Sequence, residues 1–279
     1  MTPDQTVEAE AGARRWAVPA AAIGAALPLI GFVARSVTLG NSNSKNTIAQ
    51  LADFNDKSAP INATAFVSGI GFLVAAAALF ALVRAVRARR PGFPSPLGLI
   101  LVVGAVLSAL NTVASSVTSG IVIGDFFTRG DVTYQRASDL NALPGPVVIG
   151  YVGLVAGFLF GAGLVAVSLN AMRVGLLPRF LGYVGIFAGI FTALPIVPAP
   201  ILFSFWLGAV GYLFSGRWPS GLPPAWRTGR AEPWPSLQQA RERAAAGAGA
   251  VPAPEPVPVA GPPAPADPGA ARRKRKKRR

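Results

Sequence analysis

A run of hydroxyl and amide side chains between residues 108 and 119 is the part of this sequence best suited to binding chemistry. At 100° per residue of an α-helix these side chains fall on one arc of about 160°, and apolar side chains occupy the rest of the helix. Such a face can hydrogen-bond a small polar solute. The candidate cavity-lining residues are Ser108, Asn111, Thr112, Ser115 and Ser119.

Two interpretations of this polar face stay open at the level of sequence. In lipid, a polar face must turn toward protein or water. It could line a cavity, or its hydroxyls could bond backbone carbonyls and let helices approach. Ser and Thr commonly pack in the second way. Asn111 favours a cavity, because a buried amide needs partners for two donors and an acceptor.

The residue types needed for most catalysis are missing. The sequence has no cysteine and no histidine, which excludes thiolate nucleophiles, disulfides and Cys/His ligation of zinc or haem. It also removes the commonest general acid or base near pH 7. No charged residue lies deep within an apolar stretch, which disfavours proton coupling. We expect no enzyme activity, no catalytic residue, no metal site and no cofactor.

The elements that carry these residues are long and apolar. Hydrophobic residues make up 52% of the 279 residues and charged residues 14%, against about 25% charged residues in soluble domains. Only a bilayer solvates apolar side chains on every side of a helix. The sequence predicts an all-α, polytopic transmembrane helical bundle. Five stretches without charge make up more than half of the chain: 16–34, 58–83, 91–124, 140–172 and 180–216.

A spanning helix needs about 20 apolar residues. The last uncharged stretch is too long for one span and has prolines near its middle, which break helices. We expect it to form two shorter helices, 178–195 and 199–215, and one kinked span is the alternative. The prediction is then about six spans within residues 16–215. The first four spans are 16–34, 61–83, 97–124 and 146–170.

Loops rich in Lys and Arg alternate along the chain with loops that contain few of them. Six spans would place all the rich loops on one side of the membrane. Dense Lys/Arg clusters mark the cytoplasmic side, and residues 84–90 together with the C-terminal tail hold most of them. We expect a multi-pass protein of the cell membrane with both termini in the cytoplasm. Residues 1–15 would be a short N-terminal tail and 216–279 a Pro/Ala-rich disordered tail. A cleaved signal peptide at 16–34 is disfavoured, because acidic residues precede this stretch.

Two spans carry glycines at helical spacing. Small residues three or four positions apart let helices touch backbone to backbone. We expect the fourth span to pack on the fifth, and homodimerisation through one of these faces is the alternative. The helix-packing glycines are Gly150, Gly153, Gly157, Gly161, Gly182, Gly185 and Gly189.

The C-terminal tail ends in eight consecutive cations. They would attract anionic inner-leaflet lipids at about 1 kcal/mol each. A solvated tail without a partner and contact with nucleic acid are the alternatives. No aromatic residue is interleaved, so we expect no specific nucleic acid. We expect Trp218, Trp226 and Trp234 to lie against the inner headgroups. The lipid-surface residues are Arg272, Arg273, Lys274, Arg275, Lys276, Lys277, Arg278 and Arg279.

One segment has a family resemblance. Residues 175–185, Gly-Leu-Leu-Pro-Arg-Phe-Leu-Gly-Tyr-Val-Gly, resemble a run at the entrance to the fifth helix of an uncharacterised bacterial family. That family comprises six-helix integral membrane proteins of unknown function. Residues 216–226 are similar to its actinobacterial members. The resemblance covers residues 16–235 and implies six helices, but it implies no activity.

Two function classes follow from these observations. The first is a structural or interaction protein of the cytoplasmic membrane, whose partners are the lipid bilayer and a further membrane protein. The alternative is transport or permeation of a small solute along the polar face of the third span. Replacing Asn111 or Ser115 by Leu separates them, because only a transporter loses flux while its fold survives.

Overall fold

Helices account for nearly all of the described chain, and no strand occurs in it. The computed structural model describes residues 2–40, 47–194, 199–219 and 221–234. They belong to one unit that ends at Trp234, and a second unit comprises residues 235–279. The expectations of a disordered tail and of lipid contacts by residues 272–279 lie outside the described residues. The all-α prediction is confirmed.

Four helices are long and apolar enough to span a membrane: α1 (Pro3–Leu39), α3 (Ser58–Arg89), α4 (Ser95–Thr128) and α6 (Pro144–Arg173). They contain the first four predicted spans. Large apolar side chains point outward on all of them, including Ile30, Phe66, Leu110 and Phe158. In water such exposure is unfavourable. The four helices are therefore compatible with a membrane protein.

Helix α1 begins earlier than we expected. Residues 3–15 of the predicted N-terminal tail are helical and continuous with the first predicted span. The cause is a capping box at the first turn. The backbone N–H of Gln5 donates to the Thr2 hydroxyl at 3.4 Å, and the Gln5 side chain accepts from Thr2 N at 2.9 Å. This cap satisfies backbone donors that a helix start leaves unpaired.

Helices α7 (Arg179–Ala193) and α8 (Ala199–Phe214) match the two shorter helices predicted before and after residues 195–198. They contain 15 and 16 residues, which gives lengths of about 22 and 24 Å. The hydrocarbon layer is about 30 Å thick. The structure therefore provides four helices of spanning length, and six crossings stay a prediction.

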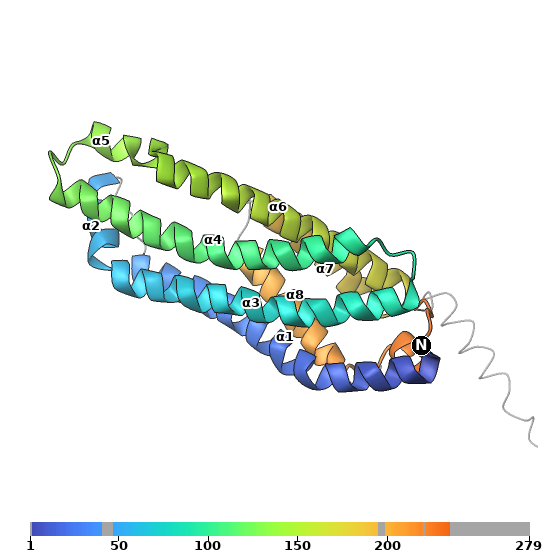
Figure 1. Cartoon of the computed structure of the whole chain (residues 1–279). Coiled ribbons are helices and arrows are strands. Elements are labelled where there is room, and N and C mark those ends of the chain that lie inside the picture. Colours follow the sequence, from blue (N-terminus) through green and yellow to red (C-terminus); the bar gives the residue numbers. More distant parts are fainter. Residues whose placement is uncertain (1, 41–46, 195–198, 220, 235–279) are drawn as a thin grey trace, which may run out of the picture. The chain divides into compact units, whose positions relative to one another are not determined.

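Short helices lie at both ends of the long ones. Helix α2 (Thr47–Asp56), helix α5 (Tyr134–Asp139) and the 3₁₀ helix η1 (Leu140–Ala142) lie at one end, here named the α2–α5 end (Figure 1). Helix α9 (Pro224–Thr228) contacts α1 at the opposite end, which also carries the N-terminus and is named the α9 end.

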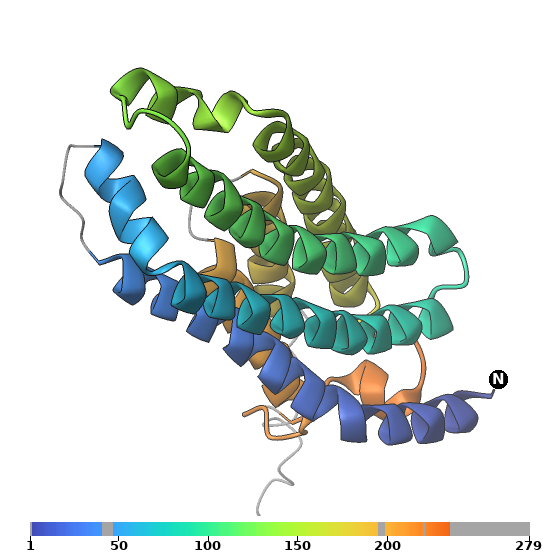
Figure 2. The ribbon, with the colours of Figure 1, turned by 60° about the vertical axis from the view of Figure 1, so that its left-hand side comes forward.

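Six helices form a closed ring within the first unit. In order, α1 packs on α3, α3 on α4, α4 on α6, α6 on α7, α7 on α8, and α8 on α1. Figure 2 shows α3 between α1 and α4, with α6 beyond α4. The main apolar core lies within this ring and includes Leu79, Leu101, Leu164, Trp206 and Leu207. The Trp206 indole N–H donates to the Leu181 carbonyl at 2.9 Å, which ties α8 to α7.

The short helix α7 covers only part of α6. Its register against α6 follows from three contacts: Gly182 faces Met172, Gly185 faces Ser168, and Gly189 faces Gly161. The last turn of α7 reaches Gly157, whose Cβ position lies 3.0 Å from the Thr192 carbonyl. The remainder of α6 toward the α2–α5 end is mostly exposed. The ring is therefore densely packed in its α9 half and looser in its α2–α5 half.

The chain after α8 stays folded, and the first unit extends to Trp234, beyond the predicted domain boundary at residue 216. Trp226 is 3% exposed rather than at a headgroup surface. Its indole N–H donates to the Leu176 carbonyl at 2.9 Å. Farther along, Glu232 N donates to the Val174 carbonyl at 3.1 Å. These two bonds fasten the segment to the α6–α7 connection.

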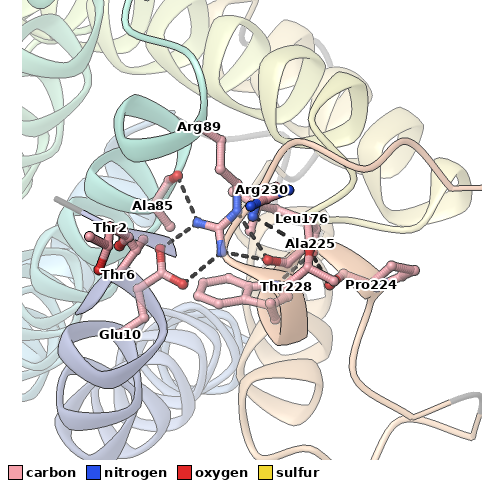
Figure 3. Close-up of polar contacts among 11 residues, drawn as sticks. Thr2, Thr6, Glu10, Ala85, Arg89, Leu176, Pro224, Ala225, Thr228 and Arg230 are labelled. Carbon is pink, nitrogen blue, oxygen red and sulfur yellow. Dashed lines mark hydrogen bonds and ion pairs between the residues drawn. The ribbon is translucent and has the colours of Figure 1, made fainter. Parts of the chain in front are cut away.

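An ion pair reinforces this end of the bundle (Figure 3). The guanidinium of Arg89 in α3 pairs with Glu10 in α1, with Nη2 to Oε2 at 2.8 Å. Arg89 also donates to the Ala225 carbonyl of α9, from Nη2 at 2.6 Å and from Nε at 3.2 Å. The side chains of Arg89 and Glu10 are 0% and 12% exposed. One buried cation therefore joins α1, α3 and α9.

Candidate functional site

Two cavities flank the polar face of α4, and Asn111 and Ser115 line both of them. We name them together the α4 cavities. The larger, of about 380 Å³, lies between α1, α3, α4 and the first turn of α8. The smaller, of about 190 Å³, lies between α4 and α6. Of the five residues predicted to line a cavity, Thr112 lines the larger and Ser119 the smaller, whereas Ser108 lines neither.

Some hydroxyls of this face are used in packing. The Thr112 hydroxyl donates to the Ser108 carbonyl one turn earlier at 2.7 Å, a common arrangement for Thr within a helix. Ser116, 2% exposed, donates to Asn62 Oδ1 of α3 at 2.7 Å. For these two side chains the packing interpretation holds, because each is satisfied within the protein.

Other polar groups have no protein partner within the described part of the chain. The side-chain oxygen of Asn111 is buried and accepts no hydrogen bond there. Ser115 and Ser119, which line the cavities, make no side-chain hydrogen bond among the described residues either. A buried polar group without a partner costs about 1–3 kcal/mol. The Ser115 and Ser119 hydroxyls, which line a polar cavity, are available to water or to a bound solute.

Three aromatic rings close the cavities toward the α9 end. Phe72 of α3 lines the larger cavity. Its ring centroid lies 6.0 Å from Phe160 of α6 and 5.8 Å from Phe203 of α8, and the last two are 5.3 Å apart. Phe160 and Phe203 are buried in the main core. The larger cavity is therefore closed by aromatic rings at this end, and a solute in it can pass only if these rings move.

A single cation lies at the other end of the larger cavity. Arg35, in the last turns of α1, lines this cavity and stacks over Phe54 of α2, with its guanidinium carbon 6.0 Å from the ring centroid. No carboxylate among the described residues pairs with Arg35. The cavity walls are therefore polar along α4 and positively charged near the α2–α5 end.

The glycines predicted for helix packing divide into two groups. Gly157 and Gly161 of α6 and Gly182, Gly185 and Gly189 of α7 lie at the α6–α7 contact. Gly150 and Gly153 instead line the smaller cavity. The Cβ position of Gly150 has no atom within 4 Å. The α6–α7 packing therefore uses only part of the glycine series.

Sequence reasoning missed the residues that α1 and α3 contribute. Thr64 and Ser68 of α3 line the larger cavity, and the Thr64 hydroxyl donates to the Ile61 carbonyl at 2.7 Å. Their spacing of four residues on one helix face was a signal that could have identified them. Among the described residues, no group of three or more His, Cys, Asp or Glu side chains could hold a metal ion.

Comparison of the chain with protein-family models, with curated proteins and with solved structures finds no match. The resemblance of residues 175–185 to a six-helix bacterial family stays a prediction.

Proposed function

We propose that this chain is a multi-pass protein of the cell membrane that binds a small polar solute in the α4 cavities and lets it permeate. Four apolar helices of spanning length and their outward-facing apolar side chains support the membrane location. The observation that carries the solute site is Asn111, which lines both cavities and whose buried side-chain oxygen has no hydrogen-bond partner among the described residues.

The lining chemistry favours an uncharged or anionic solute that both donates and accepts hydrogen bonds. The free hydroxyls of Ser115 and Ser119 can do both, and the Asn111 oxygen accepts. Arg35 adds a positive charge near the α2–α5 end. Permeation then requires displacement of the Phe72, Phe160 and Phe203 rings, so the site is gated. The absence of histidine and cysteine supports a non-enzymatic role.

Thiol labelling tests whether water reaches the site. The native chain contains no cysteine, so single-cysteine variants report one position each. Ser115→Cys is expected to react with a small membrane-impermeant thiol reagent in intact vesicles. Ala109→Cys, on the same helix but 2% exposed, is the matched control and is expected to stay unreacted. Equal protection of both positions would show that the α4 cavities are dry.

Flux measurements test permeation. Proteoliposomes containing the wild-type chain are expected to equilibrate glycerol or urea faster than empty liposomes in stopped-flow light scattering. Asn111→Leu removes the amide and fills the space beside it, and it is expected to abolish the excess flux while the protein stays folded in detergent. Unchanged flux in a folded Asn111→Leu protein contradicts the proposal.

The sidedness is part of the proposal, with both termini in the cytoplasm. Its support is the concentration of arginine at the α9 end, where Arg84, Arg87, Arg89 and Arg90 close α3. Ser138→Cys and Ala231→Cys place exposed thiols at the α2–α5 and α9 ends respectively. In intact cells, only Ser138→Cys is expected to react with an impermeant reagent.

A second candidate function is a structural or interaction protein that binds another membrane protein. The favouring observation is the half of α6 that α7 leaves uncovered. Its side chains Val148, Tyr151 and Val155 are exposed, and Gly150 is open to close approach. Photocrosslinking from position 151 in native membranes is expected to trap a protein under this hypothesis and only lipid under the first.

A further inference from the structure

A further cavity is separate from the α4 cavities. It has a volume of about 670 Å³ and lies between the α9-end halves of α1 and α3. We name it the α1–α3 groove. Its volume is in the range of small-molecule sites, about 300–1,000 Å³. Its lining residues are Thr6, Ala9, Glu10, Ala13, Trp16, Phe80, Ala81, Arg84, Ala85, Arg87 and Ala88.

The groove has an apolar interior that crosses the edge of the apolar stretches. Alanines form much of its lining, and two half-exposed aromatic side chains, Trp16 at 42% and Phe80 at 45%, line it as well. Trp16 begins the uncharged stretch 16–34, and Phe80 lies close to the end of the uncharged stretch 58–83. The groove therefore runs from the region expected in hydrocarbon to the region of lipid headgroups, where Trp side chains are enriched.

The charges in the groove are predominantly positive. Glu10 lines it, but the buried guanidinium of Arg89 neutralises this carboxylate. Arg84 lies over the Phe80 ring at 5.9 Å and is exposed. Arg87 donates from Nη2 to the Ser95 carbonyl at 2.5 Å, while its Nε is buried and has no partner among the described residues. The exposed Arg84 is therefore available to an anion at the polar end of the groove, and Arg87, which lines the groove, adds positive charge beside it.

We propose that the α1–α3 groove binds one anionic phospholipid. An acyl chain lies along the alanines between Trp16 and Phe80, and the phosphate pairs with Arg84 and Arg87. Phosphate accepts hydrogen bonds from guanidinium groups in a bidentate manner, and the apolar part of the groove provides the surface that a free phosphate cannot use. The lipid holds α1 against α3 beside the buried Arg89–Glu10 pair. This site is independent of the α4 cavities.

Native mass spectrometry of the full-length protein tests the site. The delipidated protein receives equimolar dioleoyl phosphatidylglycerol and dioleoyl phosphatidylcholine. The wild type is expected to retain one more phosphatidylglycerol than the Arg84→Gln/Arg87→Gln variant, with at least tenfold selectivity over phosphatidylcholine. The basic C-terminal residues are the same in both proteins, so the difference reports the groove.

A matched control removes the same charge elsewhere. Arg15 and Arg179 are exposed and do not line the groove, so Arg15→Gln/Arg179→Gln is expected to bind as the wild type does. Loss of the lipid from both double variants would mean that net charge, and not the groove, attracts it, and would overturn the proposal. Equal retention of the two lipids by the wild type would also overturn it.

A variant that narrows the groove tests whether an acyl chain lies along its alanines. Ala13→Phe fills the groove without changing any charge and is expected to lower phosphatidylglycerol retention at least tenfold. Retention at the wild-type level by a folded Ala13→Phe protein would overturn the proposal. Glycerol phosphate at millimolar concentration is expected not to displace the lipid, and displacement would instead indicate a site for a free phosphate.

Discussion

The side-chain amide of Asn111 in α4 occupies the space that a side chain at position 153 in α6 would need. A Cβ built on Gly153 would lie 2.6 Å from Asn111 Nδ2 and 3.3 Å from its Cγ. The glycine therefore permits the amide to lie between the two helices, beside the α4 cavities that Asn111 lines. The contact is with the end of a flexible side chain, so a larger residue at position 153 displaces the amide before it separates the helices.

Gly153→Ala is expected to reduce solute flux by more than half with little change in stability. Alanine gains about 1 kcal/mol over glycine within a helix, which offsets the cost of rotating the Asn111 side chain. Gly12→Ala is the control, because its Cβ meets no atom within 4 Å and Gly12 lines neither of the α4 cavities. The measurements are stopped-flow flux and thermal unfolding in detergent. Equal flux in the two variants would argue against a role for the Asn111 orientation.

Substitution at the α6–α7 contact is expected to lower the stability of the protein, unlike Gly153→Ala. A Cβ on Gly161 would clash with the Gly189 carbonyl and lie 2.9 Å from the backbone nitrogen of Ala193. Backbone atoms cannot rotate away, so Gly161→Ala forces the helices apart at a cost of about 1–3 kcal/mol. A lower midpoint of thermal unfolding than that of Gly150→Ala is the expected result. Matching midpoints would mean that α7 is not held closely against α6.

Loss of the Arg89 side chain is expected to destabilise the α9 end strongly. Arg89→Met leaves the Glu10 carboxylate, 12% exposed, without its counter-ion, and removing one member of a buried pair costs about 3–5 kcal/mol. Lysine cannot reproduce the bidentate contact, so Arg89→Lys is expected to restore little. The double variant Glu10→Gln/Arg89→Met should regain part of the loss. Thermal unfolding in detergent measures these stabilities. If the losses caused by Glu10→Gln and Arg89→Met simply added in the double variant, the two side chains would not be energetically coupled.

The position of the true domain end is tested by truncation. A chain ending at Trp234 is expected to unfold at the temperature of the full-length chain. A chain ending at Pro223 loses the buried Trp226, whose ring packs 5.4 Å from Phe214, and should lose about 3–5 kcal/mol. Trp226→Phe keeps a ring but not the bond to Leu176, at a cost of about 1 kcal/mol. Indistinguishable stability of the two truncated chains would contradict the packing of α9.

Hydropathy and proline placement were sufficient to predict the long apolar helices and the α7–α8 pair, apart from the start of α1. The long uncharged runs gave α3, α4 and α6, and the prolines at 195, 198 and 200 located the break between α7 and α8. The start of α1 was also readable, since Thr2 and Gln5 have capping-box spacing. The predicted span begins only at residue 16, because the charged residues Arg14 and Arg15 bound the uncharged stretch there.

Contacts between distant segments could not be predicted in this way. The polar face of α4 was visible in the sequence, but the pairing of Ser116 with Asn62, 54 positions away, depends on how α3 faces α4. The same holds for Trp226 and Leu176, 50 positions apart. The prolines among residues 216–234 made this segment resemble a linker. It folds because the Trp226 indole bonds the Leu176 carbonyl, a contact that the sequence does not reveal.

The half-length pair α7 and α8 has a consequence for topology mapping. Two consecutive helices of nearly equal length return the polypeptide to the leaflet from which it left, whether they traverse the bilayer or turn back within it. If the four long helices each cross the membrane as proposed, the number of crossings is even in both cases. Reporter enzymes fused before Thr2 and after Trp234 should therefore register the same compartment, and only a tag between α7 and α8 can distinguish a re-entrant hairpin from two complete passages.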